Sequence, residues 1–316
     1  MIEAITESGL EMRIPKVVGK YILEREIGKG ASSVVFEARH KLTNVVYACK
    51  AVSREFINAN DTLMHLEQEL RIHMTLKHPH ICKIEDVIYQ PSCIFVFMEY
   101  CANGDMFQWL NKMPLDINLR FVAQIISAIS YLHERGIAHQ DIKPENILID
   151  QNWDIKIADF GNCDSTKNCQ KLSFYGTVDY APPEVFQQTI FDKKAIDIWQ
   201  IGILFFEMFT GYLPWGTDKS VLPDQITGGL ISIPPDVPFV VQKLIKSCAV
   251  VNPKERATIE EVKRIEENKK KIKKAIVSSG RQICWKSTLN LRKDSMKEFG
   301  IPVAKSFRAE NGVFVY

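Results

Sequence analysis

The stretch HQDIKPENILID, residues His139 to Asp150, decides how the rest of this chain is interpreted. It places a carboxylate, an amine and an amide within six residues, as Asp141, Lys143 and Asn146. A second carboxylate, Asp159, follows in IADFG. Phosphoryl transfer needs a carboxylate that orients the hydroxyl nucleophile, oxygen ligands for magnesium, and cations on the moving phosphate. These two stretches supply all of them except a cation for the outer phosphates.

We expect that cation nearer the N-terminus, on a strand that follows a glycine turn. The turn reads IGKGASSVV from Ile27 to Val35, and its first two glycines allow the backbone to approach phosphates closely. Lys50, in YACK, lies on the next predicted strand but one. Two glycines alone are a weak sign of phosphate binding, because most such pairs are turns. Combined with Lys50 and the distant DFG, they predict a phosphate-binding loop.

The order of the predicted elements indicates an α+β chain with two lobes. Residues 21–52 alternate as strands, residues 61–77 have helical spacing, and IFVFMEY is a buried strand. After residues 101–104, three long apolar segments predict helices, with one short strand pair around ILID and IKIADF. Strands followed by helices favour a β-rich small lobe and a helical large lobe.

With these motifs in place, the chain resembles the eukaryotic protein kinase family over residues 17–265. The KPEN run and Gly176-Thr177 resemble the serine/threonine type, and TGYLPW and NPKERAT resemble the calcium/calmodulin-dependent and AMP-activated group. The resemblance implies transfer of the γ-phosphate of ATP, with Mg²⁺, to serine or threonine hydroxyls of protein substrates. It divides the chain into an N-terminal extension (1–16), a kinase domain (17–265, with N-lobe 17–98, hinge 99–104 and C-lobe 105–265) and a basic tail (266–316).

The resemblance also implies a role for each motif residue. Asp141 would orient the substrate hydroxyl and Lys143 would stabilise charge on the moving phosphate, while Asn146 and Asp159 would bind Mg²⁺. Lys50 would hold the inner phosphates, paired with Glu69. Glu184 would pair with Arg256, and the helix that contains residues 197–202 would support the catalytic loop, residues 139–146. The residues implied to contact ATP are Ile27, Gly28, Lys29, Gly30, Ala31, Ser32, Ser33, Val35, Ala48, Lys50, the gatekeeper Met98, the hinge residues Glu99 and Cys101, Asp105, Glu145 and Leu148.

Acidic residues near the predicted site suggest a substrate preference. Asp105 and Glu145 match positions that, in basic-directed relatives, hold an arginine three residues before the target hydroxyl, and Asp224 is a looser third candidate. The alternative for Asp105 is that it caps a helix and contacts ribose.

Two other function classes compete with this reading. A pseudokinase that binds ATP without transferring phosphate predicts loss of a catalytic residue, yet Lys50, Asp141, Asn146 and Asp159 are all present. A dinucleotide-dependent dehydrogenase needs a glycine motif that opens a helix. Here VVFEARH predicts a strand after the glycines, which excludes that class.

Charge is unevenly distributed along the chain. The net charge is +2, but residues 263–316 carry 14 Lys or Arg against 5 Asp or Glu, so this end contributes +9 and the remainder −7. Residues 258–277 have helical spacing. A basic helix of this kind predicts a passive solvated helix, an autoinhibitory or acidic-partner contact, or contact with an anionic membrane. No nucleic-acid partner is expected.

Cysteine usage and hydropathy bear on location. Eight cysteines without CxxC spacing predict reduced thiols, and the longest apolar stretch, residues 201–209, is too short to span a bilayer. The N-terminus lacks the pattern of a signal peptide. These features predict a cytoplasmic protein without a transmembrane segment, with passage into the nucleus left open.

Four positions depart from the family pattern. Ser33 replaces the third glycine, Gln140 replaces the arginine of His-Arg-Asp, and Pro182 replaces an alanine. His73 stands where relatives place an apolar residue behind the active site. A buried histidine with a satisfied partner and a pH-sensitive contact are the two alternatives for it.

The departure at Gln140 bears on activation. The expected phosphate acceptor of the activation loop is Ser173, and a phosphoserine orders a loop through charge-assisted bonds to arginine or lysine. Gln140 cannot supply such a bond. The remaining candidates are His65, on the predicted helix that contains Glu69, and Lys167 and Lys171 within the loop. We therefore expect phosphorylation of Ser173 to stabilise the active loop little, and control to lie elsewhere, with the basic tail as one candidate.

Overall fold

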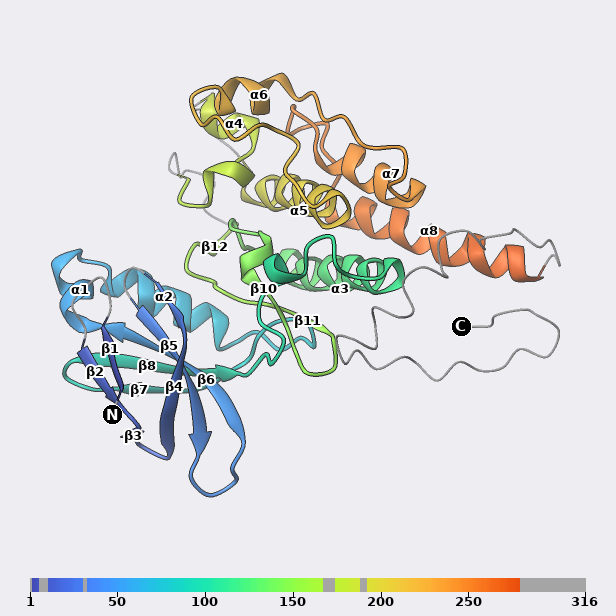
Figure 1. Ribbon diagram of the computed structural model, residues 1–316. Coiled ribbons are helices and arrows are strands. Elements are labelled where there is room, and N and C mark those ends of the chain that lie inside the picture. Colours follow the sequence, from blue (N-terminus) through green and yellow to red (C-terminus); the bar gives the residue numbers. More distant parts are fainter. Residues whose placement is uncertain (1, 6–10, 31–32, 167–173, 188–191, 279–316) are drawn as a thin grey trace.

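The computed structural model describes residues 2–5, 11–30, 33–166, 174–187 and 192–278. Figure 1 shows two lobes, one built on a sheet with helices α1 and α2 and the other mostly helical. The predicted α+β, two-lobed arrangement is therefore confirmed. Ala31, Ser32, Lys167, Lys171 and Ser173 lie outside the described residues.

A six-stranded antiparallel sheet forms the small lobe, in the order β3-β4-β5-β6-β8-β7. Its strands are β3 (Lys16–Val18), β4 (Tyr21–Lys29), β5 (Ser33–His40), β6 (Val46–Ser53), β7 (Ile84–Tyr89) and β8 (Cys93–Glu99). Side chains alternate between its two faces, as they must in a strand. One face of the sheet packs against α1 (Arg54–Ala59) and α2 (Leu63–His73). The other face forms a separate apolar core.

That second core includes residues from the predicted N-terminal extension. Strands β1 (Ile2–Ile5) and β2 (Glu11–Ile14) form an antiparallel hairpin. Met12 and Ile14 of β2 are only 3% and 2% exposed and belong to the same cluster as Tyr21 and Phe97. The apolar core of the small lobe therefore begins before residue 17.

Helices α3 and α5 form the centre of the large lobe, with α7 and α8 packed beside them. The helices of this lobe are α3 (Leu115–Glu134), α4 (Pro183–Phe186), α5 (Lys193–Thr210), α6 (Leu222–Gly228), α7 (Phe239–Cys248) and α8 (Ile259–Ser278). Helix α5 begins at an Asp192 cap and ends at Gly211, whose φ of 83° is the left-handed geometry that favours glycine. The helices predicted from apolar spacing are confirmed.

Helix α3 is long and apolar enough, by length and composition, to cross a membrane. Half of its most apolar window is buried inside the protein, where it packs against α5 and α8. Core helices pass the same test, so its apolar residues are accounted for by the core of the lobe.

Helix α8 confirms the helix predicted for residues 258–277. Val262 is fully buried and Ile265 is half-buried against the core of the large lobe. Its first half is therefore part of that lobe. The side chains from 269 onward and all of residues 279–316 lie outside the description, so the role of the basic tail stays a prediction.

Four short strands position the active-site loops. Strands β10 (Ile147–Ile149) and β11 (Ile155–Ile157) form a hairpin, and β9 (Ile137–Ala138) pairs antiparallel with β12 (Asp164–Ser165). The catalytic loop follows β9, and DFG lies between β11 and β12. The 3-10 helices η1 (Met106–Trp109), η2 (Pro144–Asn146) and η3 (Val178–Tyr180) complete the surroundings.

Candidate active site

A single buried carboxylate on α5 holds the start of the catalytic loop. Asp197 is 0% exposed, and it accepts hydrogen bonds from the backbone N–H of His139 at 2.9 Å and of Gln140 at 2.7 Å. Nε2 of His133 lies 2.8 Å from the same carboxylate. Gln140 has a φ of 66°, a conformation that costs free energy for a residue other than glycine. Asp197 therefore stabilises a strained turn directly before Asp141.

Gln200, one turn along α5, completes this support. Its Oε1 accepts from the N–H of Ile142 and its Nε2 donates to the carbonyl of Gln140, both at 3.0 Å. Because Gln200 is fully buried, its amide needs such partners. The predicted support of the catalytic loop by the helix that contains Asp197 is thus confirmed.

Asp141 lies at the centre of a group of polar side chains. Its Oδ2 is 3.1 Å from Nζ of Lys143 and accepts from Nδ2 of Asn146 at 3.1 Å. Its Oδ1 accepts from the backbone N–H of Thr177 at 2.9 Å and from the hydroxyl of Thr177 at 2.8 Å. Lys143 also donates to that hydroxyl at 2.7 Å. The carboxylate can therefore accept a hydrogen bond from an aliphatic hydroxyl while a cation lies beside it.

Lys50 of β6 lies between two carboxylates. Its Nζ is 3.9 Å from Oε1 of Glu69 on α2 and 3.6 Å from Oδ1 of Asp159. The positive charge of Lys50 lowers the pKa of Asp159. Burial lowers the pKa of Lys50, but the charges of Asp159 and Glu69 outweigh burial, so the pKa is raised. Burial raises the pKa of Glu69, against the attraction of Lys50. Lys50 is therefore a cation and Asp159 an anion at neutral pH.

The ring of Phe160, next to Asp159, is packed between two histidines. It is fully buried, 4.3 Å from the ring of His73 and 4.9 Å from that of His139. Nε2 of His139 donates to the carbonyl of Ala158 at 3.1 Å, and its Nδ1 accepts from the N–H of Asp141 at 3.3 Å. His139 therefore connects the catalytic loop to the residue directly before Asp159.

His73 is a buried histidine with a satisfied partner. It is 3% exposed, and its Nε2 lies 2.6 Å from the carbonyl oxygen of Cys82. Burial lowers its pKa to about 4, so the ring is neutral at pH 7 and Nε2–H is the donor. Of the two alternatives for this position, the structure supports the satisfied histidine. A contact that changes with pH near neutrality is not supported.

The described residues that are predicted to contact ATP come from β4, β5, β6, β8, η2, β10 and the chain segments beside them. Strand register places Val35 opposite Gly28 on one side and Lys50 on the other. The N–H of Gly30 donates to the carbonyl of Ser33 at 2.8 Å. Ser33, Ala48 and Cys101 are buried, Gly28, Val35, Met98, Glu99 and Leu148 are half-buried, and Ile27, Lys29 and Gly30 are exposed.

The two acidic residues at the rim have different surroundings. Asp105 caps η1: Oδ1 accepts from the N–H of Gln108 at 3.2 Å and Oδ2 accepts from its side chain at 3.0 Å. The structure therefore shows the helix cap of that alternative, and the contact of Asp105 with ribose stays a prediction. Glu145, in the first turn of η2, is exposed.

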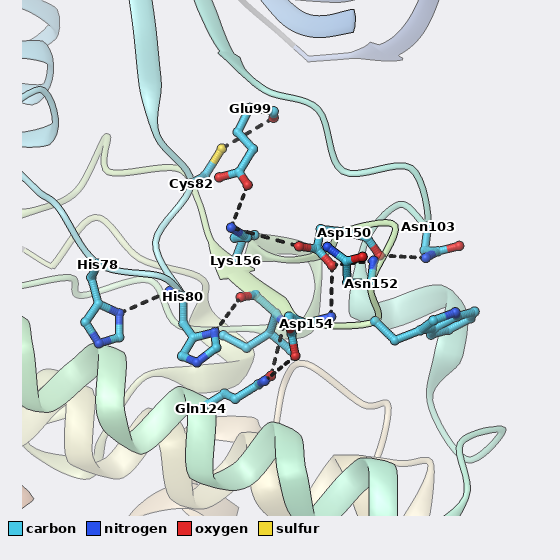
Figure 2. A network of polar contacts seen from close by, with 12 residues as sticks. His78, His80, Cys82, Glu99, Asn103, Gln124, Asp150, Asn152, Asp154 and Lys156 are labelled. Carbon is cyan, nitrogen blue, oxygen red and sulfur yellow. Dashed lines mark hydrogen bonds and ion pairs between the residues drawn. The ribbon is translucent and has the colours of Figure 1, made fainter. Parts of the chain in front are cut away.

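A polar network behind the hinge connects the two lobes, as Figure 2 shows. Nζ of Lys156 on β11 lies 2.5 Å from the side chain of Glu99 and 4.0 Å from that of Asp150. The thiol of Cys82 donates to the carbonyl of Glu99 at 3.7 Å. A cavity of about 800 Å³ opens on this side, lined in part by Tyr47, Glu99 and Lys156. The network restrains the side chain of a hinge residue from the large lobe.

The predicted pair of Glu184 and Arg256 is confirmed. The guanidinium donates to both carboxylate oxygens, at 2.8 and 2.9 Å, and both side chains are buried. This bidentate geometry is among the strongest for an ion pair. It attaches α4, at the end of the activation segment (residues 159–184), to the chain that leads into α8.

Sequence reasoning missed several contacts at the site. Lys156 carried no motif that distinguishes it from a solvated lysine. The hydroxyl of Thr177 was part of a recognised pair, but its contact with Asp141 was not predicted. Glu207 accepts a hydrogen bond from Tyr180, and the one available signal was its place as a lone carboxylate in an apolar stretch.

The side chains present fit a nucleotide-bound magnesium ion. Nδ2 of Asn146 donates to the backbone carbonyl and to the side chain of Asp141, at 2.8 and 3.1 Å, which leaves its Oδ1 as an acceptor. The carboxylate of Asp159 is 49% exposed. Among the described residues there is no cluster of three or more His, Cys, Asp or Glu side chains that could hold a metal alone. Mg²⁺ commonly takes one or two protein oxygens plus phosphates and water, which agrees with this donor set.

Replacing His73 by leucine should make the fold less sensitive to acid. The pKa of His73 is about 4 in the folded protein against an ordinary value of 6.5, so the unfolded chain binds the proton more tightly. The contribution of neutral His73 to the free energy of unfolding is therefore complete above pH 6.5, the pKa in the unfolded chain. It decreases as the pH falls toward about 4, the pKa in the folded protein. From pH 7 to pH 5 this effect should lower the free energy of unfolding by about 2 kcal/mol.

Urea unfolding at pH 7 and pH 5 measures this effect. His73→Leu should narrow the difference in unfolding free energy between the two pH values, and His65→Leu, at an exposed position of the same helix, serves as the control. An equal pH dependence in wild type and His73→Leu would contradict a buried, neutral His73.

Comparison with known proteins places the chain in a family. Residues 21–266 match the protein kinase domain. The SNF1-like protein kinase ssp2 of Schizosaccharomyces pombe is 36% identical over 255 residues, which cover 78% of this chain and 44% of that protein. Sucrose non-fermenting protein kinase 1 of Fusarium virguliforme is 35% identical over 254 residues, covering 78% and 36%. Serine/threonine protein kinase OSK3 of Oryza sativa subsp. indica is 32% identical over 250 residues, covering 77% and 49%.

The chain spans half or less of the length of these curated relatives. The family match, by contrast, covers most of this chain, from the start of β4 to the first half of α8. It includes Lys50, Asp141 and Asp159, whose geometry is described above. The chain belongs to the protein kinase domain family.

Proposed function

We propose that this chain is an active serine/threonine protein kinase that transfers the γ-phosphate of ATP to protein hydroxyls. One observation carries the proposal: Lys50 lies between Glu69 and Asp159 while Lys143 and Asn146 both contact Asp141. These are the charges and ligands that phosphoryl transfer requires. The names of the relatives, which include serine/threonine protein kinases, support the substrate class.

The chain's own residues divide the work of the reaction. Asp141 accepts the hydrogen bond of the incoming hydroxyl and orients it, as it does with the hydroxyl of Thr177. Lys143, 3.1 Å from Asp141, stabilises negative charge that develops beside the hydroxyl. Lys50 holds the inner phosphates, and Glu69 holds Lys50.

Asn146 and Asp159 would hold Mg²⁺, which when bound neutralises charge on the phosphates. Asp159 is suited to this role because the charge of Lys50 lowers its pKa and keeps it ionised. The backbone of Glu99 and Cys101 at the hinge would contact the adenine, between Ala48 and Leu148.

A pseudokinase is the less favoured alternative. It would require that a catalytic position be lost or displaced, whereas Lys50, Asp141, Asn146 and Asp159 are all present and contact one another as described. No contact of the described residues favours a scaffold without transfer activity.

The proposal predicts that Asp141→Asn lowers turnover by ~10²-fold or more, the scale of a lost general base. The amide has the same shape as the carboxylate, so ATP binding should be nearly unchanged. Transfer of radiolabelled phosphate to a mixed serine/threonine peptide library measures turnover, and nucleotide titration measures binding. Asp116→Asn, an exposed position on α3, is the matched control. Turnover of Asp141→Asn within a few-fold of wild type would overturn the assignment.

We further propose a preference for arginine upstream of the target hydroxyl, carried mainly by Glu145. Burial raises the pKa of Glu207, and the negative charges of Glu145 and Asp179 also raise it. These three carboxylates therefore lie close enough to one another to favour a cationic side chain beside the catalytic loop. Glu145 is the exposed one next to the catalytic loop, whereas the oxygens of Asp105 are used by Gln108.

Replacing Glu145 by glutamine should weaken this preference about fivefold, equivalent to the ~1 kcal/mol of an exposed ion pair. The measurement is the ratio of kcat/KM for two peptides that differ by arginine or alanine upstream of the serine. Asp116→Asn again serves as the control. A wild-type enzyme that shows no upstream basic preference would refute the proposal.

A further inference from the structure

A lysine at the start of α5 is buried, although it has no part in the proposed mechanism. Lys193 is the first residue of α5 and is only 3% exposed. Its Nζ lies 3.0 Å from Oδ2 of Asp164 and donates to the carbonyl of Ser165 at 3.0 Å. Burial of an ammonium group is unfavourable unless the charge is paired and hydrogen-bonded, and here it is both.

The place of Lys193 in its helix makes the pairing more informative. A cation in the first turn of a helix meets the positive end of the helix dipole, which is unfavourable. Lys194, the next residue, is only half-buried. The helix dipole therefore does not favour a buried lysine at position 193, whereas the contacts with Asp164 and Ser165 do.

Asp164 is the point where several elements of the active site meet. It lies on β12, five residues after Asp159, and pairs through its backbone with Ala138 of β9, directly before the catalytic loop. Its Oδ1 accepts from Nε2 of Gln68 on α2, at 3.4 Å, and Gln68 directly precedes Glu69. One carboxylate thus contacts both α2 and α5 while its backbone holds the strand before the catalytic loop.

A neutral contact restrains the same segment from the catalytic loop. Nε2 of Gln140 donates to the carbonyl of Asn162 at 2.8 Å, and Gln140 is 8% exposed. The chain between Asp159 and Asp164 is therefore held at Asn162 by an uncharged amide and at Asp164 by an ion pair with the buried Lys193. Both contacts belong to the chain itself and need no phosphate group.

We propose that Asp164 and Lys193 are positioning residues for phosphoryl transfer. Their ion pair fixes the start of the activation segment between α5 and α2, and through it the position of Asp159 relative to Lys50 and Glu69. An aspartate and a lysine of the chain thus do permanently what a phosphate and a basic receptor would do conditionally. This inference rests on the proposed kinase function.

Four variants test the proposal. Lys193→Met removes the charge and keeps most of the apolar stem, and Asp164→Asn removes the partner charge at nearly constant shape. Lys193→Arg retains the charge, and Lys194→Met changes the neighbouring, half-buried lysine as a matched control. The readouts are kcat and KM for ATP and peptide, thermal unfolding, and amide hydrogen exchange of residues 162–166.

We expect Lys193→Met and Asp164→Asn to lower kcat at least tenfold at temperatures well below their unfolding midpoints, with a smaller change in KM for peptide. Residues 162–166 should exchange at least tenfold faster in both variants. Lys193→Arg should keep kcat within about threefold of wild type, and Lys194→Met should resemble wild type. If Lys193→Met does not fold, Asp164→Asn alone decides the question, because it leaves the buried lysine its bond to Ser165.

The exchange measurement separates this inference from the proposed function. Unchanged exchange in the folded variants overturns the inference, whatever the activity. Faster exchange with unchanged kcat also overturns it, because the pair would then be structural only. If wild type transfers no phosphate in any assay, the proposed function fails and the positioning role fails with it, even if exchange shows that the pair orders the segment.

Discussion

The hydrogen bonds accepted by Asp197 are the constraint on which the rest of the active site depends. The catalytic loop must turn sharply enough to bring Asp141 toward the substrate, and Gln140 adopts a left-handed backbone conformation to do so. A turn of this kind persists only where its surroundings hold it. Asp197 supplies that hold with one fully buried carboxylate, and the two backbone N–H donors with His133 satisfy the buried charge.

From Asp197 the support spreads along α5. Gln200 fixes the backbone on either side of Asp141. Lys193, the first residue of α5, holds β12, the strand that follows DFG. One helix in the core of the large lobe therefore positions both halves of the site. Its buried polar side chains lie among apolar neighbours, where each hydrogen bond is stronger than in water and each unpaired group more costly. Such a network favours one arrangement of the loops over others.

Much of the site could be predicted from the sequence because its chemistry is local. Lys143 and Asn146 lie within a few residues of Asp141, and the DFG and glycine-loop motifs have fixed spacing. The two lobes followed from strands that precede helices. The pair of Glu184 and Arg256 is far apart in sequence, and it was predicted only because both residues belong to recognised motifs.

The other contacts of the site are long-range, and no local sequence pattern predicts them. Lys193 begins a helix and reads as a solvated residue, since nothing near it in sequence indicates that Asp164 will lie 3.0 Å away. The partner of His73 is a backbone carbonyl, which every residue has, so spacing could not identify it. Asp105 was ambiguous for a different reason. A carboxylate before a short helix can cap that helix or bind a ligand, and only the placement of Gln108 distinguishes the two.

We conclude that groups of the chain itself assemble the active site, without a phosphate on the activation loop. The most direct measurement is the first turnover of wild-type protein treated with a phosphatase and shown by mass spectrometry to carry no phosphate. Rapid-quench transfer of radiolabelled phosphate from ATP, with Mg²⁺ and a peptide substrate, follows that turnover. We expect a first-turnover rate at least as fast as the kcat of untreated protein, with no lag. A lag that ends only when the protein has phosphorylated itself would contradict it.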